Sequence, residues 1–529
     1  MVHEKKASRL RAREGWLSGL NPTVAIVSKS LVLVVVVFTV LMTDAASVAF
    51  STLREGIVST LKWYYIALVA FVLGFAIWLM MSRFGHIKLG RDDEKPEFSF
   101  FSWFAMLFGA GMGIGLVFWS VAEPLTHFES NPFLQNPGSP RAAEVAMRLT
   151  FFHWGLHPWA IYAVVGLALA YFSFRRGLPL TIRSTLYPLL GERIYGPWGH
   201  AIDILSIFAT IFGVATSLGL GMQQVNTGLY VVGGWEVSIS HQLILIGVVT
   251  SLAVISVATG LEVGIRRLSE LNILLSVLVL AFVFIYGPTR LLVLGVMQST
   301  GDYIQNVVWL SLWTDATLDT GWQGGWTTFY WGWWISWAPF VGMFIARISR
   351  GRTVREFVAG VLIVPTLITF IWFGIMGGTA LHLELDQAAD LITPVNEDMT
   401  LGIYAMFTAL DSGAIGLIAA VLATLLIATF FVTSSDSGTL VINTIMSVGD
   451  PDPPISHRVI WGVSEGAVAA VLLIGGGLTA LQAASISAAL PFSVIMIFMM
   501  IALVNGLKSD PGARILVHPN EVRSPSPGE

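Results

Sequence analysis

Long apolar runs separated by short polar connections follow one another along almost the whole chain. A run of about 18 or more apolar residues can cross a bilayer as a helix. The pattern predicts such spans at 25–47, 60–82, 100–122, 147–172, 198–229, 238–260, 268–288, 324–347, 354–377, 413–446, 457–478 and 483–507. We therefore expect an all-α membrane protein of about twelve transmembrane helices, with the lipid bilayer as its partner.

Between the seventh and eighth spans, residues 289–315 mix apolar and polar positions. The apolar positions include Leu291, Leu292, Val296, Ile304, Val307, Val308 and Leu312. This mixture is typical of an amphipathic helix that lies along the membrane surface.

Basic residues gather in every second connection. One side of the predicted membrane collects Lys5, Lys6, Arg9, Arg11, Arg13, Arg83, Lys88, Arg91, Lys95, Arg175, Arg176, Arg183, Arg193, Arg266, Arg267, Arg347, Arg350, Arg352 and Arg355. Because basic loops stay in the cytoplasm, both termini are predicted to be cytoplasmic, in a multi-pass protein of the cell (inner) membrane. The first 22 residues are charged and lack a cleavage site, so the first apolar run is interpreted as a retained helix.

Composition agrees with this class and excludes others. The 529 residues are 55% hydrophobic and only 12% charged, against about 25% charged in soluble proteins. Cysteine is absent, which excludes disulfides, thiol catalysis and cysteine-ligated metal. A net charge of −4 gives no reason to expect nucleic acid as a partner.

An aromatic run opens the eighth span, where residues 326–337 contain five tryptophans and a tyrosine. Electron-rich ring faces attract a cation that cannot donate hydrogen bonds, so such a cluster is typical of a cage for a quaternary ammonium group. An aromatic belt at the membrane interface is the alternative, although belts place one or two rings and not a run.

The fourth span adds Trp154, Trp159 and Tyr162, which share or adjoin one face of a continuous helix. Together with Trp334 and Trp337 they could surround a trimethylammonium group.

His153 and His157 lie four residues apart in the same span, a spacing that also suits a metal ion. A third ligand is not evident, and we favour packing or hydrogen-bonding histidines.

Four glycines fall within residues 109–115 of the third span. Each weakens a helix by about 1 kcal/mol relative to alanine, and unwound backbone is tolerated in a membrane where it lines a cavity. Freed carbonyls near Met112 could bind a cation, and freed amides at Met112, Gly113 and Gly115 could meet a substrate carboxylate. Close helix packing through small residues is the alternative.

The tenth span brings the hydroxyls of Thr433 and Ser434 into an apolar helix. With carbonyls near Met112 they would make a sodium site. The alternative is that each hydroxyl donates to the carbonyl four residues earlier.

These segments together are similar to the betaine/choline/carnitine transporter family. The motifs are Gly-Met-Gly-Ile-Gly at 111–115, Trp-Ser-Val-Ala-Glu-Pro at 119–124, His-Trp-Gly-Leu-His-Pro-Trp at 153–159, Trp-Gly-Trp-Trp-Ile-Ser-Trp-Ala-Pro-Phe at 331–340 and Ala-Arg-Ile-Ser-Arg-Gly-Arg-Thr at 346–353. The resemblance covers roughly residues 20–507 and implies a LeuT-like core of two inverted five-helix repeats, assembled as a homotrimer. The implied organisation is a cytoplasmic tail (1–24), two peripheral helices (25–99), a first repeat (100–288), the surface helix and loop (289–323), a second repeat (324–507) and a short cytoplasmic tail (508–529).

The resemblance also assigns roles to single residues. It adds Trp333 to the residues along the substrate path, and it assigns the sodium site to backbone at Gly109, Met112 and Phe430 with the Thr433 and Ser434 hydroxyls.

One departure from the family pattern concerns a second sodium, expected at Thr210 and Phe340. Members that carry it have a second threonine four residues after the first, whereas this chain has Val214, which weakens the case. Sodium-independent exchangers instead insert an arginine from the seventh span. Here residues 271–274 read Leu-Asn-Ile-Leu, so coupling through at least one sodium is favoured.

The predicted function is sodium-coupled import, by alternating access, of a zwitterionic onium compound of the glycine betaine or dimethylsulfoniopropionate type. A cation such as choline would gain from a buried carboxylate, and the acidic residues Glu123, Asp203, Glu270, Asp411 and Asp436 fall at span ends or outside the cage. A proton-coupled or exchange-type transporter of choline or carnitine is the alternative. No enzyme motif is present, and no cofactor is expected beyond Na⁺ as the coupling ion.

Overall fold

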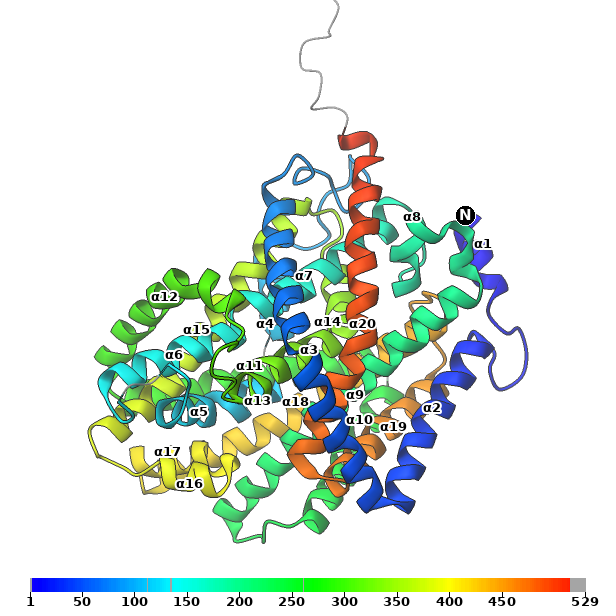
Figure 1. The fold of residues 1–529 in the computed structure, drawn as a ribbon. Coiled ribbons are helices and arrows are strands. Elements are labelled where there is room, and N and C mark those ends of the chain that lie inside the picture. Colours follow the sequence, from blue (N-terminus) through cyan, green and yellow to red (C-terminus); the bar gives the residue numbers. More distant parts are fainter. Residues whose placement is uncertain (1, 112, 134–135, 260, 514–529) are drawn as a thin grey trace, which may run out of the picture.

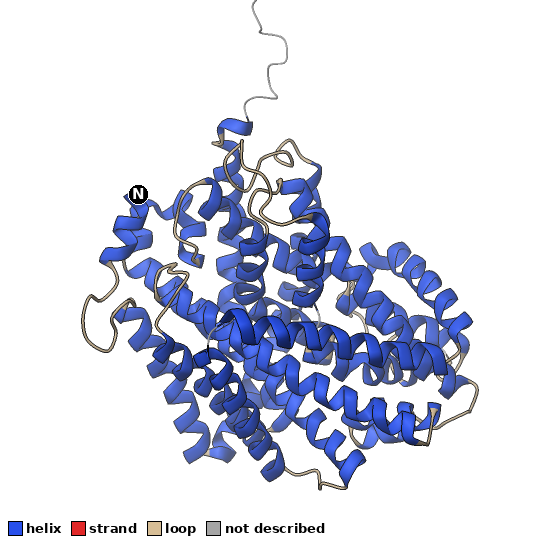
Figure 2. Ribbon diagram, turned by 180° about the vertical axis from the view of Figure 1, so that it is seen from behind, coloured by secondary structure: helices blue, strands red, loops and turns tan. Residues whose placement is uncertain are grey.

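The computed structural model describes residues 2–111, 113–133, 136–259 and 261–513 (Figures 1 and 2). The α-helices within these residues are α1 (Val2–Arg9), α2 (Pro22–Leu41), α3 (Thr43–Met81), α4 (Phe100–Gly111), α5 (Ile114–Glu129), α6 (Pro140–Trp154), α7 (Leu156–Ala170), α8 (Tyr187–Leu190), α9 (Pro197–Gly233), α10 (Ile239–Thr259), α11 (Leu261–Tyr286), α12 (Thr289–Leu312), α13 (Trp322–Gly325), α14 (Thr327–Ile348), α15 (Val354–Leu385), α16 (Ile392–Glu397), α17 (Gly402–Leu410), α18 (Ala414–Met446), α19 (Ile455–Ile474) and α20 (Gly477–Lys508). The remaining named elements are short 3₁₀ and π turns, so the prediction of an all-α protein is confirmed.

Ten segments of this described chain are long and apolar enough to cross a membrane. The two other predicted spans correspond to the pair α4–α5, which is interrupted after Gly111, and to α14. The polar groups of its tryptophans and tyrosine lower the mean hydropathy of α14. Both exceptions are therefore segments with unusual composition, and both contribute to the site described below.

The second span differs from its predicted bounds. It was expected to begin near residue 60, but α3 begins at Thr43 and runs for 39 residues, with only Met42 separating it from α2. Residues 43–59 include Arg54 and Glu55, which lower hydropathy but are compatible with helical hydrogen bonding. Hydropathy therefore placed the start of the apolar stretch, and the helix itself begins earlier.

The aromatic helix α14 lies at the centre of the molecule (Figure 1). It packs against α7 and α9 on one part of its surface and against α20 and α3 on another. Nearly all of its side chains are buried, including Trp331, Trp333 and Trp334. The position of α14 explains why a run of large rings is tolerated there, since protein and not lipid surrounds it.

Ion pairs join the basic loops and both ends of the chain at one end of the molecule. Lys6 Nζ lies 2.7 Å from Glu192 Oε2, and Arg350 Nε lies 2.6 Å from Glu94 Oε1. Arg175 Nη2 lies 2.8 Å from Asp510 Oδ1, just beyond α20. These ion pairs therefore connect basic loops with Lys6 near the start of the chain and with Asp510 after α20, and a cytoplasmic location of both termini stays a prediction.

The predicted surface helix is found as α12, which packs against α6 and α15. Arg148 of α6 holds it through two contacts with Asp302, Nε to Oδ2 at 2.6 Å and Nη2 to Oδ1 at 2.9 Å. Its exposed apolar side chains are Leu291, Val293, Leu294, Met297, Ile304, Val308, Trp309 and Leu312. One face of α12 is therefore anchored, and the other is available to lipid or a neighbouring subunit.

Candidate functional site

The glycine-rich part of the third span is broken, as its composition predicted. α4 ends at Gly111 and α5 begins at Ile114, with Gly113 extended at φ −154° and ψ 179°. Gly113 supplies no side-chain cap to α5. The amide of Leu116 donates to the Gly113 carbonyl at 3.1 Å, whereas Ile114 and Gly115 hold the first positions of α5, whose amides have no partner within the helix.

The fourth span is also broken, which corrects the expectation of a continuous helix. α6 ends at Trp154 and α7 begins at Leu156, with Gly155 between them. A Cβ at Gly155 would lie 2.5 Å from the Phe151 carbonyl oxygen and 3.0 Å from the Tyr303 hydroxyl. The crowding at this junction therefore requires a residue without a side chain.

Groups freed by this second break bind partners on other helices. The His153 carbonyl accepts a hydrogen bond from Trp334 Nε1 at 3.1 Å, and the Leu156 amide donates to the Tyr303 hydroxyl at 3.1 Å. Pro158 follows in the first turn of α7, where a residue without an N–H is tolerated. The break thus ties α6 to the aromatic helix α14 and to α12.

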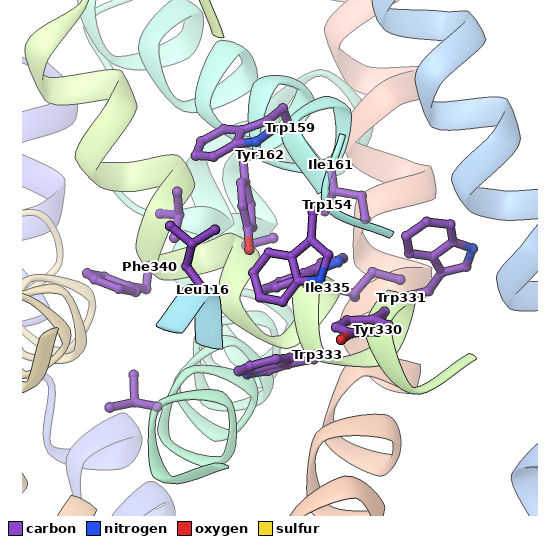
Figure 3. Packing of buried hydrophobic residues seen from close by; sticks show 14 of the residues in the cluster. Leu116, Trp154, Trp159, Ile161, Tyr162, Tyr330, Trp331, Trp333, Ile335 and Phe340 are labelled. Atoms are coloured by element: carbon purple, nitrogen blue, oxygen red, sulfur yellow. The ribbon is translucent and has the colours of Figure 1, made fainter. Parts of the chain in front are cut away.

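The two breaks and α14 surround one cavity of about 50 Å³. Figure 3 shows Trp154, Trp159, Tyr162 and Trp333 gathered between α7 and α14. The residues that line the cavity are Gly113, Gly115, Leu116, Trp154, Pro158, Trp159, Tyr162, Ser217, Trp333, Trp334, Trp337 and Thr369. This lining contains no charged side chain among the described residues.

The rings that line the cavity contact one another both edge to face and in a stack. Trp154 and Trp334 lie 4.9 Å apart between ring centroids at 70°, whereas Trp333 and Trp334 stack at 4.8 Å and 12°. Trp159 and Tyr162 meet edge to face at 5.5 Å. Ring faces carry the negative part of the aromatic quadrupole, so this arrangement suits a cation.

Hydrogen bonds from the indole nitrogens hold the rings of α14 in place. Trp333 Nε1 donates to Ser217 Oγ at 3.2 Å, and Trp337 Nε1 donates to the Gly213 carbonyl at 2.8 Å, both on α9. Trp334 Nε1 donates to the carbonyl freed at the α6–α7 break. The polar edges of these rings are thereby bound by the protein, which fixes the orientation of the rings that line the cavity.

Gly115 permits the close approach of two of these rings. A Cβ at this position would overlap Trp333 Cη2 and would lie 3.1 Å from Trp154 Cη2. Gly115 therefore lets the backbone of α5 form part of the cavity wall.

All the predicted substrate-binding residues that the structure describes line this cavity, namely Gly113, Gly115, Trp154, Trp159, Tyr162, Trp333, Trp334 and Trp337. Met112 lies outside the described residues. Sequence reasoning missed Leu116, Pro158, Ser217 and Thr369. The only available signal was that Ser217 and Thr369 place hydroxyls in otherwise apolar helices.

The interpretation of Glu123 as remote from the cage needs correction. Its side chain does not line the cavity, but its carboxylate accepts a hydrogen bond from the indole nitrogen of the cage residue Trp154 at 2.8 Å. The residue is fully buried on α5. Sequence position put Glu123 near the end of a span, and only the packing of α5 against α6 brought it to the ring.

The two histidines considered as a metal pair bind different partners. His157 Nε2 lies 2.8 Å from Ser311 Oγ, while His153 Nδ1 lies 2.7 Å from Glu123 Oε1. A different trio, Glu123, His127 and His153, has potential ligand atoms within 4.8 Å of one another. Hydrogen bonds already join the members of this trio, so the arrangement is that of a polar network.

The described part of the predicted sodium site lies on α18 and, through the backbone of Gly109, on α4. Thr433 Oγ1 is 3.0 Å from the Phe430 carbonyl oxygen and 3.2 Å from Asn272 Nδ2. Thr433 and Ser434 are both partly exposed. Met112 is outside the described residues, and only a helical backbone is described at Gly109. Asn272 belongs to residues 271–274, the stretch compared above with the arginine of the exchangers. It contacts Thr433 through an uncharged amide.

The predicted second sodium site keeps the internal hydrogen bond that competes with metal binding. Thr210 Oγ1 donates to the Ser206 carbonyl at 2.8 Å, and Phe340 contacts Trp337 edge to face. A sodium ion at Thr210 and Phe340 stays a prediction.

Comparison with known proteins assigns the chain to a family. The sequence model of the betaine/carnitine/choline family transporters (BCCT) matches residues 23–512. The chain belongs to this family. It is 44% identical to the glycine betaine transporter of Acinetobacter baylyi over 93% of its length and 74% of that protein. It is 45% identical to the glycine betaine transporter OpuD of Bacillus subtilis, over 90% of this chain and 92% of the relative.

A third BCCT relative, the probable glycine betaine transporter of Desulfitobacterium hafniense, is 44% identical over 92% of this chain and 98% of its own. A solved manganese transporter of Eremococcus coleocola covers 83% of this chain and 92% of its own at 14% identity and a TM-score of 0.41, a loose overlay. The expected membership of the family is confirmed. The protein is a multi-pass membrane transporter and not an enzyme.

Proposed function

We propose that this BCCT protein imports a zwitterionic onium compound, of the glycine betaine or dimethylsulfoniopropionate type, by sodium symport and alternating access. The observation that carries the proposal is the cavity in which aromatic faces adjoin the uncapped start of α5. The onium group would lie between the rings. Its carboxylate would meet the first amides of α5, where the helix dipole also favours negative charge.

The uncharged lining supports a ligand that carries both charges itself. Such a ligand needs no buried counter-ion along the described cavity wall, and it is also the chemistry named for several of the relatives. We expect Trp334→Ala to raise the Km for glycine betaine at least tenfold, since cation–π contacts at desolvated sites are worth about 2 kcal/mol or more. Radiolabelled uptake measures this, and an unchanged Km would refute the cage.

The oxygen ligands proposed for sodium are the hydroxyls of Thr433 and Ser434 on α18. The Thr433 hydroxyl lies 3.0 Å from the Phe430 carbonyl oxygen and 3.3 Å from the Thr429 carbonyl oxygen, so sodium would replace these internal hydrogen bonds. Hard oxygen donors suit a small alkali cation, and no described lysine or arginine pairs with these hydroxyls. Bound sodium would stabilise the α4–α5 break in the conformation that binds the onium. Rocking of one repeat against the other would then expose both ligands to the cytoplasm.

The test is uptake of labelled glycine betaine into proteoliposomes with and without an inward sodium gradient, competed by dimethylsulfoniopropionate, choline and carnitine. Thr433→Ala and Ser434→Ala should abolish the sodium stimulation. Thr429→Ala is the matched control, because Thr429 lies one turn away on α18 and donates to the Leu425 carbonyl. Sodium-stimulated uptake that survives in both site variants would contradict the assignment.

A proton-coupled or exchange-type transporter of choline or carnitine is the second candidate. It is favoured by two buried carboxylates, Asp436 on α18 and Glu465 on α19. Ser435 Oγ donates to Glu465 Oε2 at 2.6 Å, whereas Glu465 Oε1 and Asp436 Oδ1 are buried without a hydrogen-bond partner. Such oxygens are more stable when the group binds a proton. Uptake driven by a proton gradient and indifferent to sodium would select this candidate.

We also propose a homotrimer in the cell membrane with both termini in the cytoplasm. The exposed apolar face of α12 supports a subunit contact, and the ion pairs between basic loops and termini support a shared side. Mass determination in detergent tests the trimer, and protease access from each side of the membrane tests the orientation.

A further inference from the structure

A fully buried carboxylate lies directly behind the aromatic cage. Glu123 Oε2 accepts hydrogen bonds from Trp154 Nε1 at 2.8 Å and from the Tyr330 hydroxyl at 2.5 Å. Glu123 Oε1 is 2.7 Å from His153 Nδ1 and 3.3 Å from His127 Nε2. α5, α6 and α14 thus meet at a single side chain.

The donor pattern corresponds to an ionised carboxylate. An ionised carboxylate only accepts, with about four lone-pair sites on its two oxygens. Trp154 Nε1 and the Tyr330 hydroxyl donate to Oε2, and the two histidine nitrogens near Oε1 donate in the tautomers that carry a proton there. A protonated Glu123 that donated to His127 Nε2 would shift the ring proton to His127 Nδ1, which is buried without a hydrogen-bond partner, and an unpaired buried donor is costly. The network therefore holds the charged form.

The histidines do not supply an evident balancing charge. His127 Nδ1 is buried without a hydrogen-bond partner, so a second proton there would have no acceptor. His153 Nε2 lies 3.0 Å from Thr327 Oγ1, whose hydroxyl can donate to a neutral ring. No lysine or arginine among the described residues forms an ion pair with Glu123. The Glu123 carboxylate is thus buried among hydrogen-bond partners, with no lysine or arginine of the described chain paired to it.

This charge is coupled to the cage through two rings. Trp154, which lines the cavity, is oriented by its hydrogen bond to the carboxylate. Tyr330 stacks on Trp334 with 5.7 Å between ring centroids and 22° between planes. Glu123 therefore orients Trp154 directly and supports Trp334 through Tyr330. Its electric field acts on the cavity through a region of low dielectric.

We propose that Glu123 is the positioning and specificity-determining residue that lets the cage bind an onium cation without a carboxylate, such as choline, alongside the zwitterion. The inference rests on the proposed function. A zwitterion is attracted by Glu123 at its onium end and repelled at its carboxylate end, so much of the effect cancels. A cation experiences only the attraction, and its binding depends on Glu123 more strongly.

The test is titration of the purified protein with choline and with glycine betaine, followed by tryptophan fluorescence. The wild type is expected to bind both. Glu123→Gln removes the charge and should raise the Kd for choline roughly tenfold, the order expected for one unit charge acting on another at an effective dielectric of about 20. The Kd for glycine betaine should rise much less, so the ratio of the two constants changes.

Glu123→Asp separates charge from position. The charge remains but the hydrogen bonds are displaced, so both Kd values should rise by similar factors and their ratio should stay near that of the wild type. Ser311→Ala is the matched control, because it removes the hydroxyl partner of the neighbouring buried His157 and leaves the Glu123 network intact. It should change neither constant. Size-exclusion profiles and melting curves report folding for each variant.

The proposal is overturned if the wild type binds glycine betaine but not choline, or if Glu123→Gln leaves the ratio unchanged. Should Glu123→Gln fail to fold, Glu123→Asp carries the test, and unchanged constants for both ligands overturn the positioning role. Failure of the proposed function gives a different result, because the wild type would then bind neither ligand.

Discussion

At the scale of single residues, the cage depends on glycines beside the rings as much as on the rings themselves. Gly115 leaves room for Trp333 Cη2 and Trp154 Cη2 to approach the backbone of α5. Gly213 does the same on α9, where a Cβ would lie 2.8 Å from Trp337 Cδ1. The tryptophans explain why a cation would bind, and the glycines explain why the rings can face one another.

Gly115→Ala is expected to weaken glycine betaine binding at least tenfold. The added methyl group overlaps Trp333, so the ring must leave its place in the cage or α5 must shift. Isothermal titration or uptake kinetics measures the change. Gly247→Ala is the control, since a Cβ there meets nothing within 4 Å on an exposed part of α10. Equal affinity in Gly115→Ala and wild type would show that the rings can adjust.

At the scale of elements, two interrupted spans make the site. The α4–α5 break places the start of α5 in the cavity wall, and the α6–α7 break frees the His153 carbonyl for Trp334. A break is tolerated in a membrane because neighbouring helices replace the lost hydrogen bonds. The Tyr303 hydroxyl from α12 provides one replacement, at 3.1 Å from the Leu156 amide.

Gly155→Ala is expected to lower the stability of the fold by about 1–3 kcal/mol, the usual cost of an overpacked site. The new Cβ would lie 2.5 Å from the Phe151 carbonyl oxygen, which belongs to rigid backbone. A lower melting temperature in detergent is the measurement. Gly295→Ala on α12 meets nothing within 4 Å and serves as the control. A melting temperature equal to that of the wild type would refute the crowding argument.

At the scale of the whole molecule, one end is held together by ion pairs between segments far apart in sequence. Arg175 bonds to both oxygens of Asp510, Nε to Oδ2 at 3.1 Å and Nη2 to Oδ1 at 2.8 Å. Burial alone would raise the pKa of Asp510, but the Arg175 side chain and the Gly512 amide hold that pKa below its usual range. The end of α20 is thereby fixed to the loop after α7.

Asp510→Asn is expected to lower the melting temperature at neutral pH. A carboxyl whose pKa is depressed in the folded state stabilises the fold above its unfolded pKa, about 3.9, and loses that contribution as the pH falls through its folded value. The difference between wild type and Asp510→Asn should therefore be full at pH 7 and shrink below about pH 4. Melting curves across this range measure it. A difference that does not depend on pH would mean that the carboxylate charge is not responsible.

Hydropathy and residue chemistry by themselves determined the helical class, the break within 109–115 and the rings that meet around the cavity. These follow from local properties, since apolar length, glycine content and aromatic density act within one segment. Only the tertiary structure decided which polar groups meet. The start of α3, the break at Gly155, the amide of Asn272 beside Thr433 and the carboxylate of Glu123 behind Trp154 depend on contacts between helices distant in sequence. Hydropathy cannot predict such contacts, because it describes the preference of each residue type for water or an apolar environment and not which side chains pack together.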